Sequence, residues 1–166
     1  GGGGPFSELI LLSSHPAPTL NHLTLQESSS GGLTMRNSNQ AIRNSTLQNL
    51  AWTGIFSSGT GNSILHTTIR NSGDYGVYVY GGDLTVRNSN ITDNTLGGVF
   101  GTVGVDARLN WWGDASGPSG SGPGTGEHVN SNVLFEPWLA APFAGPFKWT
   151  EVINSPDPFT PRGGWT

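Results

Sequence analysis

Apolar residues return along this chain at a constant interval of 22 residues, in three separate columns. The first column holds Leu25, Leu47, Ile69 and Ile91, and Trp112 follows after 21. The second holds Leu33, Ile55, Val77 and Val99, and the third holds Leu20, Ile42, Ile64, Val86 and Ala107. Short apolar–polar alternation flanks each column, as in a half-buried β-strand. The columns therefore predict three short strands in every repeat.

Repeats of this kind bury their apolar sides only against neighbouring repeats. Asn, Ser, Gly and Asp gather between the predicted strands, where they tolerate turn dihedrals and bond their own backbone. No segment keeps the 3.6-residue period of a helix over a helical length. We therefore expect an all-β fold, a single-stranded parallel β-helix of about 4–5 coils, in which each strand pairs with the strand one coil away.

The columns also divide the chain. We expect β-helix coils of about 22 residues in residues 1–109, a C-terminal cap with a Gly/Pro/Ser loop in residues 110–139, and an extended arm rich in Pro and aromatic residues in residues 140–166. A cap protects the open sheet edges of a solenoid. The side chains expected to cover the last coil are Trp111, Trp112, Phe135 and Trp138.

The N-terminal end offers no comparable set of aromatic residues. Leu11 lies 22 residues before Leu33, which indicates an incomplete first coil. An uncovered edge of this kind attracts another strand. We therefore expect a protein partner or further β-helix coils at this end, and a glycan is a second expected contact of the chain.

Two internal segments and the C-terminal segment have a distinctive sequence: Tyr75–Tyr80, Leu84–Asn94, Asn110–Pro118, Gly126, Val129 and Val133–Leu139. These segments resemble a known family, the pectin-lyase-like right-handed β-helix proteins, and in particular those of bacterial and archaeal surfaces. The resemblance extends over residues 9–139 and implies a right-handed helix. Because this fold serves lyases, hydrolases, adhesins, phage spikes and structural proteins alike, the resemblance implies no single activity.

Composition narrows the possible functions. Charged residues are only 11% of the chain and the formal net charge is −4, so nucleic-acid binding is not expected. The chain has no Cys, which excludes disulfides and fits an extracellular or cell-surface location. No apolar run approaches the roughly 20 residues that a membrane span needs.

Polar columns beside the strands are candidates for chemistry. Asn49 and Asn71 fall in one column, where stacked amides form structural ladders. The same column ends in Asp93 and Asp114, one coil apart, and about 5 Å between two carboxyl groups suits a retaining glycosidase. A neighbouring column adds two cations that could bind an acidic sugar, Arg87 and Arg108. We expect no cofactor and no metal centre, with Ca²⁺ at the two Asp residues as an open alternative.

Aromatic residues form an outward column. Phe56, Tyr78 and Phe100 each follow an inward-facing apolar residue, so strand alternation points them outward, and Tyr80 lies nearby. Such a strip is either covered by another part of the chain or serves as a contact surface. We expect a non-catalytic exported structural, adhesin-like or assembly module that binds protein or glycan through this strip and the C-terminal arm. The alternative is a carbohydrate-active enzyme, a polysaccharide lyase or glycoside hydrolase, that uses the two Asp and two Arg residues.

Overall fold

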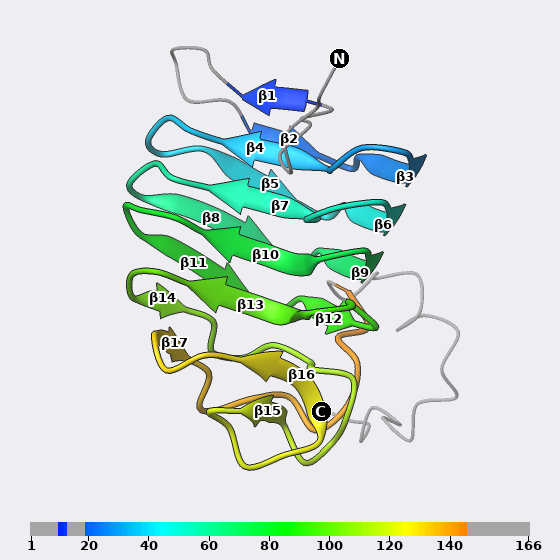
Figure 1. The fold of residues 1–166 in the computed structure, drawn as a ribbon, viewed down its shortest axis with the longest axis vertical. Coiled ribbons are helices and arrows are strands. Elements are labelled where there is room, and N and C mark those ends of the chain that lie inside the picture. Colours follow the sequence, from blue (N-terminus) through cyan, green and yellow to red (C-terminus); the bar gives the residue numbers. More distant parts are fainter. Residues whose placement is uncertain (1–9, 13–18, 146–166) are drawn as a thin grey trace, which may run out of the picture.

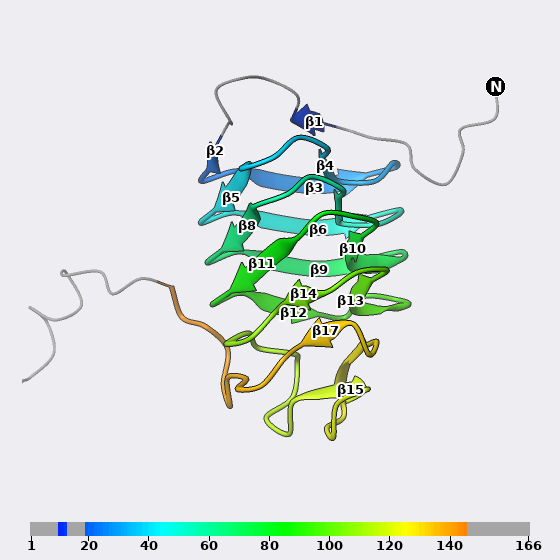
Figure 2. The ribbon, with the colours of Figure 1, turned by 90° about the vertical axis from the view of Figure 1, so that its left-hand side faces the viewer.

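Each repeat of the chain forms three strands, and equivalent strands of successive repeats pair in parallel. The structure, a computed structural model, describes residues 10–12 and 19–145. The coils stack along one axis, and a complete coil has one strand on each of three sides (Figures 1 and 2). Among the described residues four coils have all three strands, within the predicted range for the number of coils.

The described strands therefore form three parallel sheets of unequal length along the stack. The seven-stranded sheet contains, in order, β1 (Ile10–Leu12), β4 (Leu33–Met35), β7 (Ile55–Ser57), β10 (Tyr75–Val79), β13 (Gly97–Gly101), β16 (Gly126–Val129) and β15 (Pro118–Gly120). The six-stranded sheet contains β17 (Val133–Leu134), β14 (Val105–Asp106), β11 (Leu84–Arg87), β8 (Asn62–Leu65), β5 (Ala41–Arg43) and β2 (Thr19–Asn21). The four-stranded sheet contains β12 (Asn90–Thr92), β9 (Thr68–Ser72), β6 (Thr46–Leu50) and β3 (Thr24–Ser28).

The three apolar columns form the core. Ile55 pairs with Val77, Ile42 with Ile64, and Leu47 with Ile69, as the 22-residue interval predicts. These six side chains are completely buried, and Trp112 continues the column of Ile69 and Ile91. The column of Val77 and Val99 gains one further member, Val129 on β16.

Left-handed residues form two bends in each of the four complete coils. One set lies before the strands of the four-stranded sheet, and its last member lies before the bridge residue Trp111; φ is between 48° and 59° at His22, Asn44, His66, Asn88 and Leu109. The other set lies at the C-terminal ends of β3, β6 and β9 and directly after β12; φ is between 52° and 59° at Glu27, Asn49, Asn71 and Asp93. Asn tolerates this region better than other residues with a Cβ, which explains why Asn recurs at 22-residue intervals.

The C-terminal end is covered by the chain itself. Trp112 is fully buried in the core, and Phe135 and Trp138 pack against the core from outside. The indole N–H of Trp138 donates to the carbonyl of Ala115 at 3.1 Å. Trp111 differs from the other three expected cap residues, because it pairs with the outward residue Asn90 and does not belong to the core cluster.

The predicted cap segment is itself a partial coil. Its strands β15 and β16 extend the seven-stranded sheet, and β17 extends the six-stranded sheet (Figure 1). The arm that follows is described as far as residue 145, and its remainder lies outside the described residues. Phe143 holds the described part of the arm against the coils, because its ring stacks on His66 at 5.0 Å between centroids. The side chain of Asn90 accepts a hydrogen bond from the main-chain N–H of Phe143 and donates one to its carbonyl.

The N-terminal end differs from the prediction in register. Leu33 pairs with Ile10 and not with Leu11, so the first step is one residue longer than the later ones. β2 and β3 are the last strands of their sheets at this end. In the described part of the chain we find no helix of the length and apolar character required to cross a membrane.

Candidate functional site

A cleft of about 370 Å³ lies between the last complete coil and the cap. One side is the bend after β12, and the other side combines the turn after Trp112 with strand β16. The lining residues are Asp93, Asn94, Thr95, Leu96, Gly97, Trp112, Gly113, Asp114, Thr125, Gly126, Glu127 and His128. The two Asp residues of the sequence prediction therefore share one cleft, and Glu127 and His128 join them.

Glu127 is placed by the coil architecture. Its main-chain N–H donates to the carbonyl of Trp112 at 2.7 Å, which aligns β16 with the preceding coil. Its carboxylate accepts a hydrogen bond from the main-chain N–H of Asn94 at 2.8 Å. One coil earlier, the Asn94 side chain accepts a hydrogen bond from the N–H of Ser72 in the same way, at 3.1 Å. Glu127 thus ends an internal polar ladder on the wall of the cleft.

This position changes the acidity of Glu127. Burial raises its pKa from 4.5 to about 7, the hydrogen bond from Asn94 opposes that increase, and the charge of Asp93 adds to it. The carboxyl group is therefore protonated in a substantial fraction of molecules near neutral pH. A protonated carboxylic acid can donate a proton to a bound ligand, which an ionised carboxylate cannot do.

The pKa of Asp114, on the opposite wall, is shifted in the other direction. The hydroxyl and the main-chain N–H of Ser116 both donate to its carboxylate, at 2.6 and 2.8 Å. These hydrogen bonds lower the pKa of Asp114 below its ordinary value. The cleft consequently combines one carboxyl group whose pKa is raised with one whose pKa is lowered, an arrangement found where carboxyl groups take different catalytic roles.

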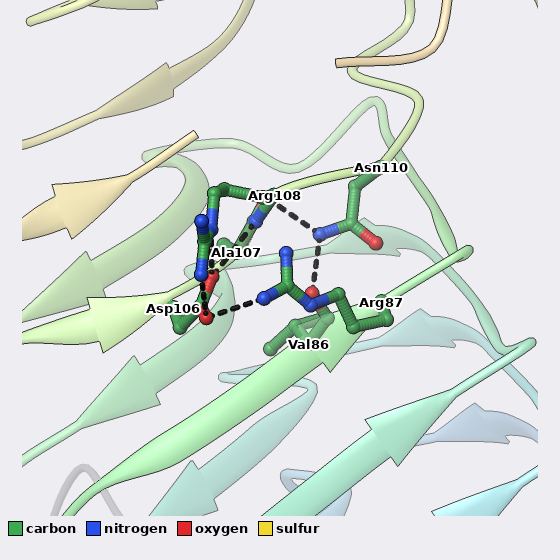
Figure 3. A network of polar contacts seen from close by, with 6 residues as sticks. All are labelled: Val86, Arg87, Asp106, Ala107, Arg108 and Asn110. Carbon is green, nitrogen blue, oxygen red and sulfur yellow. Dashed lines mark hydrogen bonds and ion pairs between the residues drawn. The ribbon is translucent and has the colours of Figure 1, made fainter. Parts of the chain in front are cut away.

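Arg87 and Arg108 belong to a different part of the surface. Both guanidinium groups point at Asp106 on β14 (Figure 3), and Arg108 binds it through Nε at 2.9 Å and Nη2 at 2.8 Å. Arg87 forms the second ion pair with the same carboxylate. The hydrogen bond from Arg108, with the charges of both arginines, lowers the pKa of Asp106. Neither arginine lines the cleft, so the four residues of the enzymatic hypothesis do not form one site.

Beside this ion-pair network, Asn110 ties the last coil to the cap. Its side-chain amide donates to the carbonyls of Val86 and Ala107, both at 2.8 Å (Figure 3). Its oxygen accepts a hydrogen bond from the N–H of Ser89 at 3.0 Å. The first residue of the predicted cap is therefore a fully buried structural residue.

The outward amide column is also structural. Asn71 donates to Asn49 at 3.0 Å, and Asn49 donates to the carboxylate of Glu27. The expected amide ladder is therefore present, on the exposed side of the bend. Asp93 continues the column into the cleft, where it no longer belongs to a run of amides.

The outward aromatic residues form a continuous set of ring contacts, which we call the aromatic strip: Phe56, Tyr75, Tyr78, Tyr80 and Phe100. The rings of Phe56 and Tyr78 stack at 5.9 Å, and those of Tyr78 and Phe100 at 5.4 Å. Tyr75, which the sequence prediction omitted, packs on Phe100 at 5.1 Å. The rings are half-buried, except that Tyr80 is 65% exposed. The strip is therefore oriented outward as predicted, but less exposed than predicted.

No cluster of three His, Cys, Asp or Glu side chains suited to a metal ion occurs within residues 10–12 and 19–145. Asp93 and Asp114, the two residues of the Ca²⁺ alternative, line the same cleft but do not belong to such a cluster.

The chain matches the family described as right-handed β-helix region over residues 14–108, more than half of its length. It belongs to this right-handed β-helix family, and its coils are turns of a right-handed solenoid. No curated protein and no solved structure matches the chain. Enzymes and non-enzymes share this fold, so the family defines the scaffold and leaves the function to the surface groups.

Proposed function

We propose that the chain is a non-catalytic exported module that contacts a partner through the aromatic strip. The observation that carries the proposal is the unbroken set of ring contacts along β7, β10 and β13, on the outer face of the seven-stranded sheet. Side chains that point outward from a solenoid do not contribute to its core, so core packing does not require aromatic residues at these positions. Tyr and Phe are, however, the residues that contact surfaces favour, because they combine large area with few rotamers.

The geometry of the strip favours a protein partner over a glycan. The planes of Phe56 and Tyr78 differ by 8°, and those of Tyr78 and Phe100 by 15°, so the rings cover one another's faces. A sugar ring needs an accessible aromatic face to stack on. Ring edges and phenol groups are instead suited to a protein surface that lies along the axis of the solenoid. The exported location is proposed from the absence of Cys.

Two exposed residues of similar accessibility allow a matched test. Tyr80 is 65% exposed within the strip, and Leu134 is 63% exposed on the six-stranded sheet. We expect Tyr80→Ser to weaken partner binding by about tenfold, the scale of one contact residue, and Leu134→Ser to leave it unchanged. Binding is measured by interferometry against a polysaccharide panel and against surface proteins of the source cell. Equal affinity of the parent chain and both variants for every bound partner contradicts the proposal.

A carbohydrate-active enzyme is the second candidate, and the cleft is the observation that favours it. Here Glu127 acts as the proton donor to the leaving oxygen, and Asp114, whose pKa is lowered, acts as the ionised partner. Arg87 and Arg108 have no part in this version. Glu127→Gln keeps an oxygen that accepts the hydrogen bond from Asn94 but removes the acidic proton.

The enzymatic candidate predicts product release from a polysaccharide panel, with activity that falls as pH rises through about 7 because Glu127 loses its proton. Glu127→Gln abolishes this release while the thermal midpoint is retained. Release that persists in Glu127→Gln, or no release by the parent chain from any polysaccharide, removes this candidate.

A further inference from the structure

We propose that the edge formed by β2 and β3 is a docking site for a further coil of the same 22-residue repeat. This inference concerns the N-terminal end and is independent of the aromatic strip. Each of these strands has a paired neighbour on one side only within the described residues, β5 for β2 and β6 for β3. β1 already lies on β4 in parallel, so one of the three sheets continues past this coil.

The apolar side chains of the edge lack the cover that one more coil provides. Leu20 and Leu25 are half-buried and pack against the core cluster. Their partners one coil further along the stack, Ile42 and Leu47, are completely buried. A further coil would bring an apolar residue over each Leu, which is how the interior coils remove this surface from water.

Side-chain ladders identify the orientation of the occupant. Gln48 donates to Gln26 at 2.8 Å, and Asn44 donates to Asn21 at 2.8 Å, so these ladders donate toward the N-terminal end. Within the described residues, the amide groups of Gln26 and Asn21 have no acceptor of their own. Glu27 ends the third ladder as an acceptor. A parallel coil in register presents acceptors to the first two positions and a donor to Glu27.

The edge is preformed. His22 and Glu27 have φ values of 57° and 56°, the same bend geometry as Asn44 and Asn49 in the next coil. A residue other than Gly or Asn in this region costs free energy, so the native contacts must hold both bends. An edge that already has the shape of an interior coil loses little entropy when another coil binds.

The other end of a second copy does not fit this description. Trp112, Phe135 and Trp138 cover its last coil, and β15 to β17 continue only two of its three sheets. Two N-terminal edges that face each other would pair antiparallel, against the direction of every pair of strands in the stack. A parallel coil of the repeat is therefore the occupant that satisfies the main chain, the core and the ladders together.

The test extends the full chain by one coil. A copy of Gln40–Gly61 is inserted between Ala17 and Pro18, which keeps the 22-residue interval and places the copied Leu47 over Leu25. In the control insertion, the copied Ile42, Leu47 and Ile55 are Ser. Amide hydrogen exchange of β2 and β3 is measured in the parent chain and in both extended chains.

We expect exchange in β2 and β3 to slow by about tenfold or more with the apolar insertion, and not with the Ser control. The inserted residues themselves should be protected as the interior coils are. Unchanged exchange at β2 and β3 overturns the proposal. Concentration-dependent dimerisation of the parent chain in sedimentation, with protection of β2 and β3 in the dimer, assigns the edge to a second copy and also overturns it.

Discussion

The two ends of this solenoid differ in how their sheet edges and core side chains are covered. At the C-terminal end, an aromatic cluster and a partial coil close the core, and Trp112 is completely buried. At the N-terminal end, β2 and β3 remain edge strands of their sheets, with Leu20 and Leu25 only half-buried. One end of the repeat array is therefore closed by specific residues, while the other keeps the generic surface of a coil.

The chemistry of the molecule follows this asymmetry. Glu127, Asp114 and the cleft exist because the cap departs from the 22-residue interval and brings β16 against the bend after β12. The coil of β2, β3 and β4 keeps the interval to the next coil and has the amide ladders of the interior coils. The cleft thus arises where the chain departs from the repeat. The coil of β2, β3 and β4 keeps the repeat, so its surface is suited to pairing with another coil of the same repeat.

The largest expected effect is a difference in stability loss between core substitutions at the two ends. Trp112→Ala should reduce the free energy of unfolding by about 3–5 kcal/mol, because it removes a fully buried ring and leaves a cavity. Leu25→Ala should cost only about 1–2 kcal/mol, because that side chain is already half-buried. Urea denaturation measures both. Equal losses would show that the open end is as well packed as the capped end.

A smaller effect is expected from pH at the capped end. Burial raises the pKa of Glu127 from 4.5 to about 7, so the folded chain binds its proton more tightly than the unfolded chain. This stabilisation is fully present below about pH 4.5 and is lost as pH rises through about 7. Because the group is partly exposed, we expect a loss of only about 1–2 kcal/mol.

The check is urea denaturation at a series of pH values between 4.5 and 8. Glu127→Gln should flatten the curve in this window, because glutamine does not titrate. Glu27→Gln, at the open end, is the matched control and should retain the slope of the parent chain. A parent chain whose stability is constant over the window would rule out the perturbed acidity of Glu127.

The smallest expected effect concerns the arm. Phe143→Ala removes the stack on His66 but keeps the main-chain hydrogen bonds to Asn90, so it should cost about 0.5–1.5 kcal/mol. We expect faster proteolysis within residues 140–145 and little change in the thermal midpoint. Leu96→Ala, which shortens a 55% exposed side chain in the cleft, is the control. Cleavage of the arm at the rate of the parent chain would show that the ring does not hold it.

The coils could be predicted from the sequence because buried positions recur at a constant interval in a solenoid. Ile69, Ile91 and Trp112 stack as their spacing predicts, since an inward residue in one coil must meet an inward residue in the next. The predicted pairing of Leu33 with Leu11 was wrong by one residue, because Leu33 pairs with Ile10. The sequence could not show this, since one extra residue in the connection between coils leaves the pattern of apolar and polar positions unchanged.

The site was less accessible to sequence reasoning. Asp93 and Asp114 share a cleft as their column suggested, but Glu127 was missed because the Gly-rich loop before it interrupts the interval. Val129, which continues the column of Val99, is the signal that could have restored the register. Arg87 ends β11 and Arg108 follows β14, both strands of the six-stranded sheet and not of the four-stranded sheet, so their partner is Asp106. Periodicity identifies neighbours along the axis, but not which side chains meet around a bend.

The parallel pairing of coil on coil has a mechanical consequence. Backbone hydrogen bonds such as those from Thr46 to Leu23 and from Thr68 to Ser45 join one coil to the next, along the axis of the stack. A force applied along that axis separates coils one after another, so it breaks only a few bonds at a time. A force applied across the axis loads the bonds of several coils together in shear. The protein should therefore yield easily when it is stretched end to end and resist when it is pulled from side to side.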